Sequence, residues 1–569
     1  MMNKIYRFLC TVCVACSFMA CADMLETDSE LVEYEKNNTL NHPTDSVYSV
    51  LGILNKIQVI ADRTVLLGEV RGDLVTTTDA ASADLKNLAN FELSKDNQYN
   101  HVSDYYAVIN NCNYYIAHVD TAMQRRGRYV FREEYAAVKA FRAWTYLELV
   151  KAYGQVPLVL TPMMTEREAR EAMALQRSDI KAVCNTFIDD LTPYADVEHP
   201  NFGTIDGKNS DYYFIPMKAL LGDLCLWAEK YEEAARWYHD YLNDRENPVV
   251  MEYNNRITWS TVSSFDESHI SDPYSIWTSD EMLSYIPMEE QVFNGHVSDL
   301  ENIFSSTVKN NYYYQLVPSR GMYRLSADQI YCIKYKAESS TTIDTLYAPR
   351  TDMYDETFVG DLRLHSNYKL NALSGQDAYS ERSSFYQRIY KVVGSRIMTY
   401  RSPMVYLRYA EALNRAGYPQ SAFAVLKYGL CNDNLGKIDK EEQDAAGDLI
   451  SFSPAFFTFE NTRGIHSRGS GDSECNAYYV MPMPAAALNS RQDTINYQIP
   501  LVEDLIVNEM ALEGAFEGNR FFDLVRVASR PGRDASYLAD RIANRGGDLN
   551  VSLRALLMDK NNWFLPLPQ

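Results

Sequence analysis

The sequence predicts a mostly α-helical protein in which paired helices form a scaffold and a long loop-rich segment supplies a second surface. Apolar residues recur at three- and four-residue steps between positions 102 and 153, the spacing of one helix face. A weak internal repeat aligns residues 217–242 with residues 405–430. Between 247 and 400 the helical periodicity fades, and Ser, Asp, Asn, Gly and Tyr dominate. We therefore expect residues 41–569 to form one large unit.

The first 20 residues have the pattern of an export signal. Lys4 and Arg7 give a basic start without acids, and residues 8–20 are apolar and small. That apolar run is shorter than the roughly 20 residues that a transmembrane helix needs. We expect residues 1–20 to be a signal peptide that export removes.

Cys21 directly follows the small residue Ala20, which resembles the lipobox of bacterial lipoproteins, whose cysteine carries the lipid. Cys16 is an alternative, but cleavage there would leave apolar residues in the mature tail. Residues 21–40 are polar and acidic near their start. They are interpreted as a tether similar to the signal that sends lipoproteins of some Gram-negative bacteria to the cell surface.

Residues 102–130 and 131–153 form the clearest predicted helix pair. Their apolar positions recur with helical spacing, and the predicted connection lies at residues 125–128. Gly154 and Pro157 then follow, as is typical of a helix end.

The internal repeat has the pattern of tetratricopeptide-type helix hairpins. In each copy a helix breaks at a short turn and resumes with small residues, which allow two helices to pack closely. The identities pair Ala228 with Ala416, Ala234 with Ala422, and Leu242 with Leu430. The expected scaffold helices lie at about 102–153, 176–245, 402–430 and 502–528.

The loop-rich segment, residues 247–400, is expected to be a binding surface. Two short apolar pieces, residues 331–335 and 386–393, are candidates for isolated strands. A segment of this length is either disordered or functional, and its aromatic residues argue against disorder. They include Tyr253, Trp259, Tyr274, Trp277 and Tyr285.

Composition and motifs disfavour several classes of function. Asp and Glu outnumber Lys and Arg by 76 to 54, and the net charge of −22 opposes nucleic-acid binding. The sequence has no H-E-x-x-H or G-x-S-x-G motif, and the six cysteines beyond Cys21 lack C-x-x-C spacing. The acidic pairs Asp189–Asp190 and Glu289–Glu290 are interpreted as solvated surface charge, because adjacent side chains point apart. We expect no catalytic residue, metal or cofactor.

Four stretches together resemble the SusD/RagB family of outer-membrane nutrient-binding lipoproteins. They are residues 139–158, which include Tyr-Gly-Gln-Val-Pro, residues 407–413, residues 508–526, and residues 564–569, which end in Pro-Leu-Pro-Gln. With the lipobox-like start, these stretches cover nearly the whole chain in the order of the family.

The resemblance implies a scaffold of four tetratricopeptide-like helix pairs, with long loops on one side that hold the ligand site. It also implies a surface-exposed outer-membrane lipoprotein of a Gram-negative bacterium that binds oligosaccharides and is not an enzyme. The implied partner is a SusC-like TonB-dependent transporter. Two alternatives stay open: a peptide-binding protein of the same fold, and an exported glycoside hydrolase, for which the sequence offers no facing carboxylate pair.

The ligand site is predicted where two distant stretches meet, residues 67–99 and the aromatic loops from 259 to 323. In the family, the site lies in loops at comparable places. The candidate residues are Asp73, Asn87, Trp259, Trp277, Tyr313 and Tyr323. Arg520 and Asp523 stand three positions apart in a predicted helix and are interpreted as a structural ion pair.

Overall fold

The computed structural model describes residues 40, 42–244, 249, 281–289, 295–305, 314–329, 332–335, 344–347, 361–372, 385–389, 391–456, 464–470 and 479–567. The predicted signal peptide, Cys21 and nearly all of the predicted tether lie outside these residues. So do three candidate site residues, Trp259, Trp277 and Tyr313.

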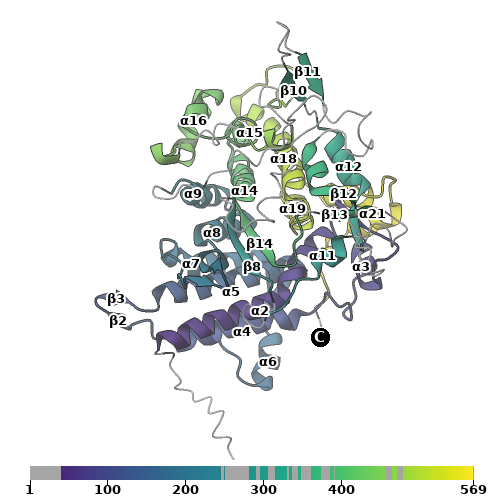
Figure 1. Cartoon of the computed structure of the whole chain (residues 1–569). Coiled ribbons are helices and arrows are strands. Elements are labelled where there is room, and N and C mark those ends of the chain that lie inside the picture. Colours follow the sequence, from purple (N-terminus) through teal and green to yellow (C-terminus); the bar gives the residue numbers. More distant parts are fainter. Residues whose placement is uncertain are drawn as a thin grey trace, which may run out of the picture.

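The protein is mostly helical (Figure 1). Its helices are α2 (Pro43–Glu69), α3 (Ala83–Ala89), α4 (Val102–His118), α5 (Arg132–Tyr153), α6 (Glu166–Met173), α7 (Ile180–Leu191), α8 (Met217–Trp227), α9 (Tyr231–Leu242), α11 (Leu300–Phe304), α12 (Arg320–Ala327), α13 (Leu362–Asn367), α14 (Ser402–Arg415), α15 (Pro419–Lys427), α16 (Lys440–Ala446), α17 (Ser467–Ser470), α18 (Arg491–Gly514), α19 (Arg520–Ala528), α20 (Ser536–Ala543) and α21 (Val551–Leu557).

The strands are short and form two-stranded antiparallel pairs. The pairs are β1 (Val75–Thr77) with β9 (Leu316–Pro318), β2 (Gln124–Arg125) with β3 (Arg128–Tyr129), β4 (Gln155–Pro157) with β5 (Arg177–Asp179), β6 (Thr204–Ile205) with β7 (Lys208–Asn209), β8 (Met282–Pro287) with β14 (Arg396–Arg401), β10 (Cys332–Tyr335) with β11 (Asp344–Tyr347), and β12 (Tyr368–Ala372) with β13 (Phe385–Ile389). The two apolar pieces expected as isolated strands correspond to β10 and β13, and each has a partner.

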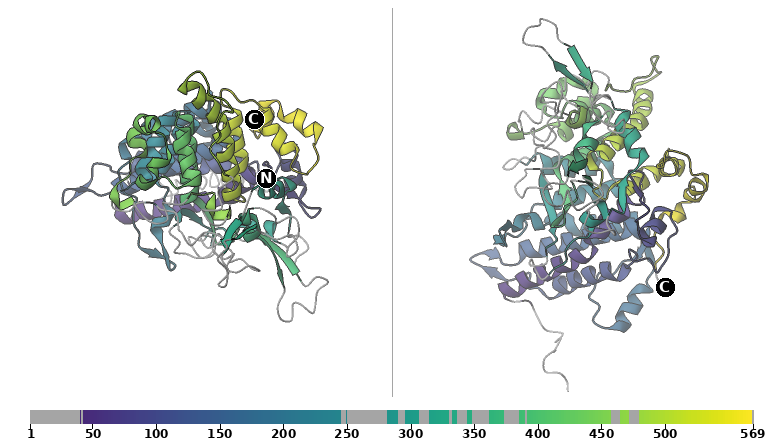
Figure 2. Two further views of the ribbon diagram at one scale, coloured as in Figure 1. Left: turned by 90° about the horizontal axis from the view of Figure 1, so that it is seen from above. Right: turned by 45° about the vertical axis from the view of Figure 1, so that its right-hand side comes forward.

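The scaffold helices stack in chain order. The pair α4 and α5 packs on α2 and α7, then α7 packs on α8, α8 on α9, α9 on α14, and α14 on both α15 and α18. Figure 1 shows this stack rising from α2, α4 and α5 at the bottom to α14, α15 and α16 at the top. The strand pair β8–β14 packs on the stack through contacts of β8 with α2 and of β14 with α14, and β12–β13 lies to the right of the stack in Figure 1. Figure 2 shows the helices from two further sides.

The internal repeat has a direct structural counterpart. Helices α9 and α15 begin at Tyr231 and Pro419, which the repeat aligns. Just before them, Glu229 and Gly417 both have positive φ angles, 61° and 102°. The N–H three residues after each helix end bonds back across the turn, from Lys230 to the carbonyl of Cys225 and from Tyr418 to the carbonyl of Leu413, both at 2.9 Å. Both hairpins therefore turn through the same Schellman-type cap.

The first predicted helix pair is wrong in one detail. Helix α4 ends at His118 rather than continuing to position 130, because Val119 is extended (φ −75°, ψ 136°) and forms a bridge with Leu40. The β2–β3 hairpin then occupies the predicted connection. Arg126 and Gly127 at its tip both have positive φ angles, as a type I′ turn requires.

Helix α2 was not predicted from the sequence. It begins with Pro43 in its first turn and buries a face that includes Val50, Leu54 and Ile57 against α4 and α5. At its end, a Cβ atom on Gly68 would come within 1.7 Å of the Gly518 carbonyl oxygen, so α2 closes on the C-terminal part of the chain without room for a side chain. No helix among the described ranges is long and apolar enough to cross a bilayer.

Candidate ligand-binding surface

The two stretches predicted to form the site meet at the β1–β9 sheet. Val75 pairs with Pro318 and Thr77 with Leu316, although more than 230 positions separate them. The Thr78 hydroxyl donates to the Tyr314 carbonyl at 2.6 Å, and the backbone N–H of Ser82 donates to a Gln315 side-chain oxygen at 2.8 Å. These bonds hold residues 75–82 and 314–318 as one small platform, which we call the β1–β9 platform.

Tyrosine side chains gather next to the β1–β9 platform. The hydroxyls of Tyr314 and Tyr368 lie 2.9 Å apart, and Tyr323 on α12 also hydrogen-bonds Tyr368. Tyr314 and Tyr323 are half-buried, whereas Tyr368 is buried. Burial raises the pKa of Tyr314 and of Tyr368, so both hydroxyls remain protonated at neutral pH and can donate hydrogen bonds.

Asn87, a candidate site residue, lies on the short helix α3 beside this platform and is half-buried. Ser82 caps α3 by accepting a hydrogen bond from the Leu85 N–H at 3.2 Å. Since the Ser82 N–H is itself bound to Gln315, the start of α3 is fixed to the β1–β9 platform. Asn87 and Tyr323 are thus the candidate residues that the described structure leaves partly exposed near it.

Asp73 has a different role from the predicted ligand contact. Its carboxylate accepts two hydrogen bonds from Arg520, from Nε at 2.5 Å and from Nη2 at 2.9 Å, and the residue is only 8% exposed. Burial opposes the charged carboxylate, but the Arg520 guanidinium outweighs it and lowers the pKa of Asp73. The carboxylate is already occupied, so we do not retain Asp73 as a ligand contact.

The Arg71-Gly72-Asp73 tripeptide is likewise structural. Arg71 is fully buried, and its guanidinium donates to the carbonyls of Leu67 and Trp563 at 2.8 and 2.9 Å. It also lies over the Phe521 ring, 4.2 Å from the centroid. Arg-Gly-Asp is a cell-adhesion motif in other proteins, but buried side chains like these cannot contact an adhesion receptor.

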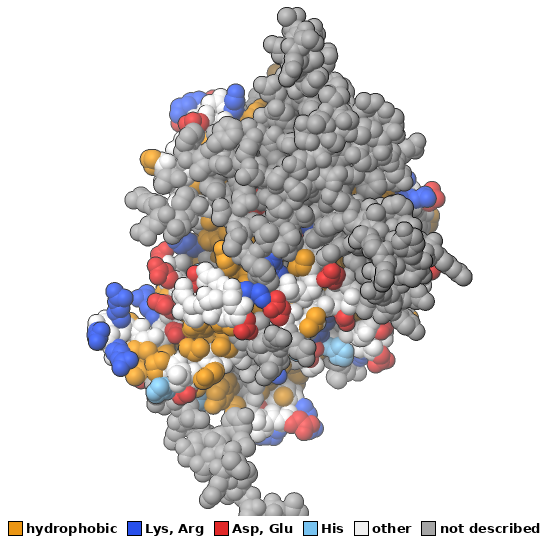
Figure 3. All heavy atoms as spheres, in the orientation of Figure 1, with side chains coloured by type: hydrophobic (Ala, Val, Ile, Leu, Met, Phe, Trp, Pro, Cys, Tyr) orange, Lys and Arg blue, Asp and Glu red, His pale blue; other side chains and the backbone are white. Residues whose placement is uncertain are grey.

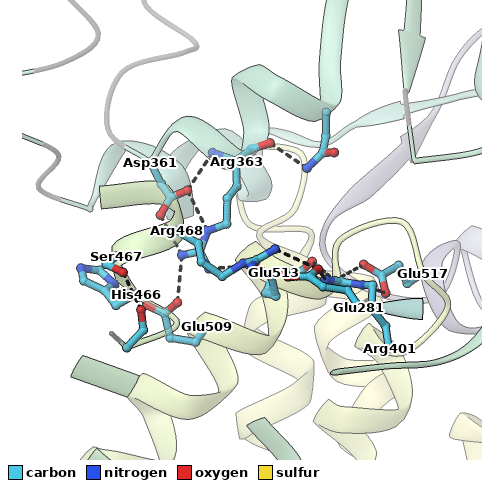
Figure 4. Close-up of polar contacts among 12 residues, drawn as sticks. Glu281, Asp361, Arg363, Arg401, His466, Ser467, Arg468, Glu509, Glu513 and Glu517 are labelled. Carbon is cyan, nitrogen blue, oxygen red and sulfur yellow. Dashed lines mark hydrogen bonds and ion pairs between the residues drawn. The ribbon is translucent and has the colours of Figure 1, made fainter. Parts of the chain in front are cut away.

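A buried ion network fastens the strand region to the scaffold (Figure 4). At its centre, the carboxylate of Glu513 on α18 contacts three guanidinium groups. The distances are 2.7 Å to Arg401, 3.1 Å to Arg468 and 3.3 Å to Arg363. Burial alone would raise the pKa of Glu513, but the three arginines lower it well below its usual range.

Other members of the network extend it to both sides. Glu281, just before β8, binds Arg468 at 2.6 Å. Glu509 binds Arg363 at 2.8 Å and His466 at 2.5 Å, and its pKa falls to about 2 because the contacts with Arg363 and His466 outweigh its burial. The network therefore ties the β8 end, α13, β14 and residues 464–470 to one helix, α18.

A second buried network lies at α19. Glu411 on α14 binds Arg526 at 2.6 Å and also pairs with Arg530, and its pKa falls to about 2 against the effect of burial. Asp523 binds Arg526 at 2.8 Å. The expected pairing of Arg520 with Asp523 is therefore wrong, although both are buried in ion pairs; each has a closer partner, Asp73 for Arg520 and Arg526 for Asp523.

A polar cavity of about 60 Å³ lies inside the scaffold, between α5, α8, β14 and α19. Asp223 in its wall accepts hydrogen bonds from the hydroxyls of Tyr238 at 2.6 Å and Tyr400 at 2.7 Å, and it pairs with Arg408 at 2.8 Å. A space of this size holds only a few water molecules. We interpret this cavity as part of the structural frame rather than as a ligand site.

The described structure shows the contacts of one member of each acidic pair considered from the sequence. Asp190 pairs with Lys139 and, at 2.8 Å, with Arg142, so it is a structural ion pair rather than free surface charge. Glu289 pairs with Lys208, and its neighbour at position 290 lies outside the described residues. Within the described ranges, no group of three or more His, Cys, Asp or Glu side chains could hold a metal ion.

The spacing of two glutamates is a sequence signal for the ion network. Glu509 and Glu513 stand four positions apart, so they share one face of α18. Two glutamates at this spacing repel each other on an exposed face, and on a buried face they require cations from elsewhere in the chain. The arginines that supply them come from positions too distant for a pattern search to assign.

Comparison with solved structures establishes the fold. A SusD superfamily protein from Bacteroides vulgatus aligns over 92% of this chain and 91% of its own, with a TM-score of 0.55 and 13% sequence identity. The fold is SusD-like. The SusD-like expectation drawn from the sequence is thereby confirmed at the level of the fold.

Two further SusD-like neighbours are described by what they bind. A SusD-like carbohydrate binding protein from Bacteroides fragilis covers 86% of both chains, with a TM-score of 0.50 and 15% identity. Surface glycan-binding protein A from Bacteroides uniformis covers 92% of this chain and 96% of its own, with a TM-score of 0.54 and 12% identity. No family model and no curated protein matches this chain.

Proposed function

We propose that this SusD-like chain is a cell-surface lipoprotein that binds oligosaccharides and passes them to a SusC-like TonB-dependent transporter. The observation that carries the proposal is the shared fold over 92% of the chain with a surface glycan-binding protein from Bacteroides uniformis. The export signal and the lipobox-like Cys21 support an outer-membrane anchor. A binding role rather than catalysis is part of the same proposal.

The proposed ligand site is the β1–β9 platform together with the neighbouring aromatic residues. A tyrosine ring offers a flat apolar face to the C–H face of a sugar, while its hydroxyl can donate to a sugar oxygen. Asn87 and Tyr323 supply an amide and a ring at this platform. Trp259, Trp277 and Tyr313 remain proposed contacts, and they lie outside the described residues.

The ion networks give this site a rigid support. Side chains that are already held in their binding positions lose less conformational entropy when the ligand binds. Glu513 and its arginines tie strands β8 and β14 to α18, and the Asp73–Arg520 pair ties the entry to β1 to α19. We propose that this frame keeps the ligand surface in one conformation.

A glycan and peptide array probed with the purified chain tests the proposed class of ligand. Binding to oligosaccharides and not to peptides is the expected result. Binding confined to peptides would replace the oligosaccharide proposal by the peptide alternative, and release of reducing ends during incubation would contradict a purely binding role. Hits then enter calorimetry to obtain a dissociation constant.

A further inference from the structure

The β2–β3 hairpin is the most basic exposed element that the structure describes. Between positions 121 and 132 the chain carries four arginines and no acidic residue. Arg125, Arg126 and Arg128 lie in the hairpin and Arg132 begins α5; all four are exposed. Asp120 precedes this stretch, and Glu133 and Glu134 follow it. This local charge contrasts with a net charge of −22 for the whole chain.

The hairpin arginines are also unneutralised. None of the four forms an ion pair with an acidic residue of the described ranges, whereas several exposed arginines on helices do. On α6, for example, Arg170 binds Glu166 at 2.7 Å and Arg167 binds Glu171 at 3.4 Å. Figure 3 shows the basic side chains projecting at the left edge of the molecule, where Figure 1 places β2 and β3.

The turn at the tip of the hairpin places the arginine side chains toward solvent. Arg126 has a φ angle of 53°, a left-handed conformation that Gly or Asn adopts more readily, and Gly127 follows with φ 79°. The two residues form the turn, so β2 and β3 project Arg125 and Arg128 on either side of it. The turn does not need an arginine for folding, so an arginine held in this strained conformation indicates that its charge has a function.

Amphipathic side chains lie at the same end of the molecule. Tyr129 is 51% exposed and Met123 is 36% exposed, both on the hairpin. Tyr48 on the second turn of α2 is 73% exposed, and the start of α2 packs against the end of α4 through a 2.6 Å bond between Ser46 and Tyr115. Tyrosine and arginine together suit the boundary between lipid headgroups and water.

The proposed lipid anchor enters the fold at this end. The backbone N–H of Leu40 donates to the His118 carbonyl at 2.9 Å, and Leu40 bridges Val119, which leads directly into the hairpin. Nineteen steps of chain separate Leu40 from Cys21, which at full extension span at most about 65 Å. The hairpin, which follows Val119 directly, therefore lies within reach of the anchor.

We propose that the β2–β3 hairpin binds the phosphate-bearing headgroups of the membrane in which the chain is anchored. The proposal rests on the lipid anchor assigned to Cys21 under the proposed function. Salt screens charges beyond a Debye length of about 8 Å, so the hairpin charge acts on nearby headgroups, and acidic residues beyond that distance do not cancel it. The anchor raises the effective concentration of the hairpin at the membrane surface, so weak contacts with the headgroups suffice for binding.

Such a contact would orient the ligand surface. In Figure 1 the hairpin lies at the lower left, and α3, α12 and the β12–β13 pair lie at the right of the molecule. The β1–β9 platform adjoins α3 and α12. When the hairpin binds the headgroups, the platform therefore lies on the part of the molecule away from that contact. The chain would be presented in one orientation rather than turning freely on its tether.

Vesicle flotation tests this inference. The probe is the Cys21→Ser variant of the mature chain, residues 21–569, mixed with vesicles of phosphatidylcholine alone or with 30% phosphatidylglycerol. We expect the chain to partition onto the anionic vesicles only, and 0.5 M NaCl to remove it. Combining Arg125→Gln, Arg126→Gln and Arg128→Gln should lower the partition coefficient by at least about ten-fold.

The matched control removes the same charge elsewhere. It combines Arg167→Gln, Arg170→Gln and Arg236→Gln, three exposed arginines that have acidic partners on their own helices. We expect this control to float as the parent does. Equal binding to both kinds of vesicle, parent-like binding of the hairpin variant, or an equal loss in the control would each overturn the inference.

The experiment separates this inference from the proposed function. Glycan titration of the hairpin variant should match the parent, because the changed side chains lie outside the β1–β9 platform. Loss of vesicle binding with intact glycan binding supports the hairpin contact specifically. A parent that binds glycan but neither kind of vesicle would overturn the hairpin contact and leave the proposed function standing.

Discussion

Asp73 and Arg520 lie 447 positions apart in the chain, yet their side chains form two parallel hydrogen bonds of 2.5 and 2.9 Å. Arg520 also donates to the Val507 carbonyl at 3.0 Å, so the pair joins the entry to β1, the start of α19 and the body of α18. One buried bidentate contact thus connects the N-terminal part of the β1–β9 platform to the C-terminal helices.

Replacing Asp73 should destabilise the fold. Asp73→Asn leaves the buried Arg520 charge without its partner, and we expect a loss of about 3–5 kcal/mol in the free energy of unfolding. Denaturant unfolding followed by circular dichroism measures this loss. Asp79→Asn, at an exposed position in the next turn, is the matched control and should change stability by less than about 0.5 kcal/mol.

The affinity of the folded Asp73→Asn fraction for glycan should match the parent. A variant with parental stability that no longer binds ligand would contradict the structural role and return Asp73 to the ligand site.

Glu513 should be the most sensitive position in the first ion network. Glu513→Gln removes the negative charge shared by Arg363, Arg401 and Arg468, which are all buried, and we expect a loss of at least about 3 kcal/mol. Thermal and denaturant unfolding of the purified variant report it. Glu441→Gln breaks only an exposed pair with Arg491 and should cost less than about 1 kcal/mol. Equal effects of the two changes would refute the assigned importance of the buried network.

Glu69 should make stability fall as the pH rises. Burial raises the pKa of Glu69 to about 7 from an ordinary value of 4.5, although the Gly518 N–H donates to its carboxylate at 2.8 Å. The folded state therefore holds the proton more tightly than the unfolded state. Its contribution is fully present below about pH 4.5, declines between pH 4.5 and 7, and is lost above pH 7.

Glu69→Gln tests this pH dependence with a neutral side chain of the same shape. At pH 8 the variant should be more stable than the parent, by up to about 3 kcal/mol, whereas near pH 4.5 the two should agree. Unfolding free energies measured at both pH values give the comparison. A parent and variant that differ by the same amount at both pH values would show that Glu69 does not titrate in this range.

Sequence patterns predicted those parts of the fold that depend on interactions between residues near each other in the chain. Helix pairs and their turns follow from apolar spacing, small residues and left-handed positions, so the repeat that aligns Glu229 with Gly417 corresponds to one shared cap geometry. Helix α2 was missed because its polar and apolar residues intermingle, and its buried face includes Arg63 and Glu69 beside aliphatic residues.

Contacts between distant residues were beyond sequence reasoning. Spacing alone paired Arg520 with Asp523, but Arg520 binds Asp73 and Asp523 binds Arg526. The same limit applies to the site. The family resemblance implied that residues 67–99 and the later loops meet, but the pairing of β1 with β9 follows only from the three-dimensional structure. Which side chains of such a platform stay exposed depends on packing that no single-sequence pattern encodes.

The proposed anchor makes a simple prediction about localisation. Cys21→Ser should remove the lipid and release the protein from the outer-membrane fraction, while Cys16→Ser should leave it anchored. Fractionation with palmitate labelling measures both. Continued labelling and sedimentation of the Cys21→Ser variant would contradict the assignment, and loss with Cys16→Ser alone would move the anchor to Cys16.

The central proposal is that the β1–β9 platform and aromatic side chains of the proposed site bind an oligosaccharide, and calorimetry on single-ring variants tests it most directly. The variants are Trp259→Ala, Trp277→Ala and Tyr323→Ala, titrated with a glycan that binds the parent. Tyr129→Ala, an exposed ring on the β2–β3 hairpin, is the matched control.

We predict that at least one of these three variants weakens binding about ten- to thirty-fold with an unchanged melting temperature, because a stacked ring contributes about 1–2 kcal/mol. The control should bind as the parent does. Parent-like affinity of the Trp259, Trp277 and Tyr323 variants would contradict the proposed site.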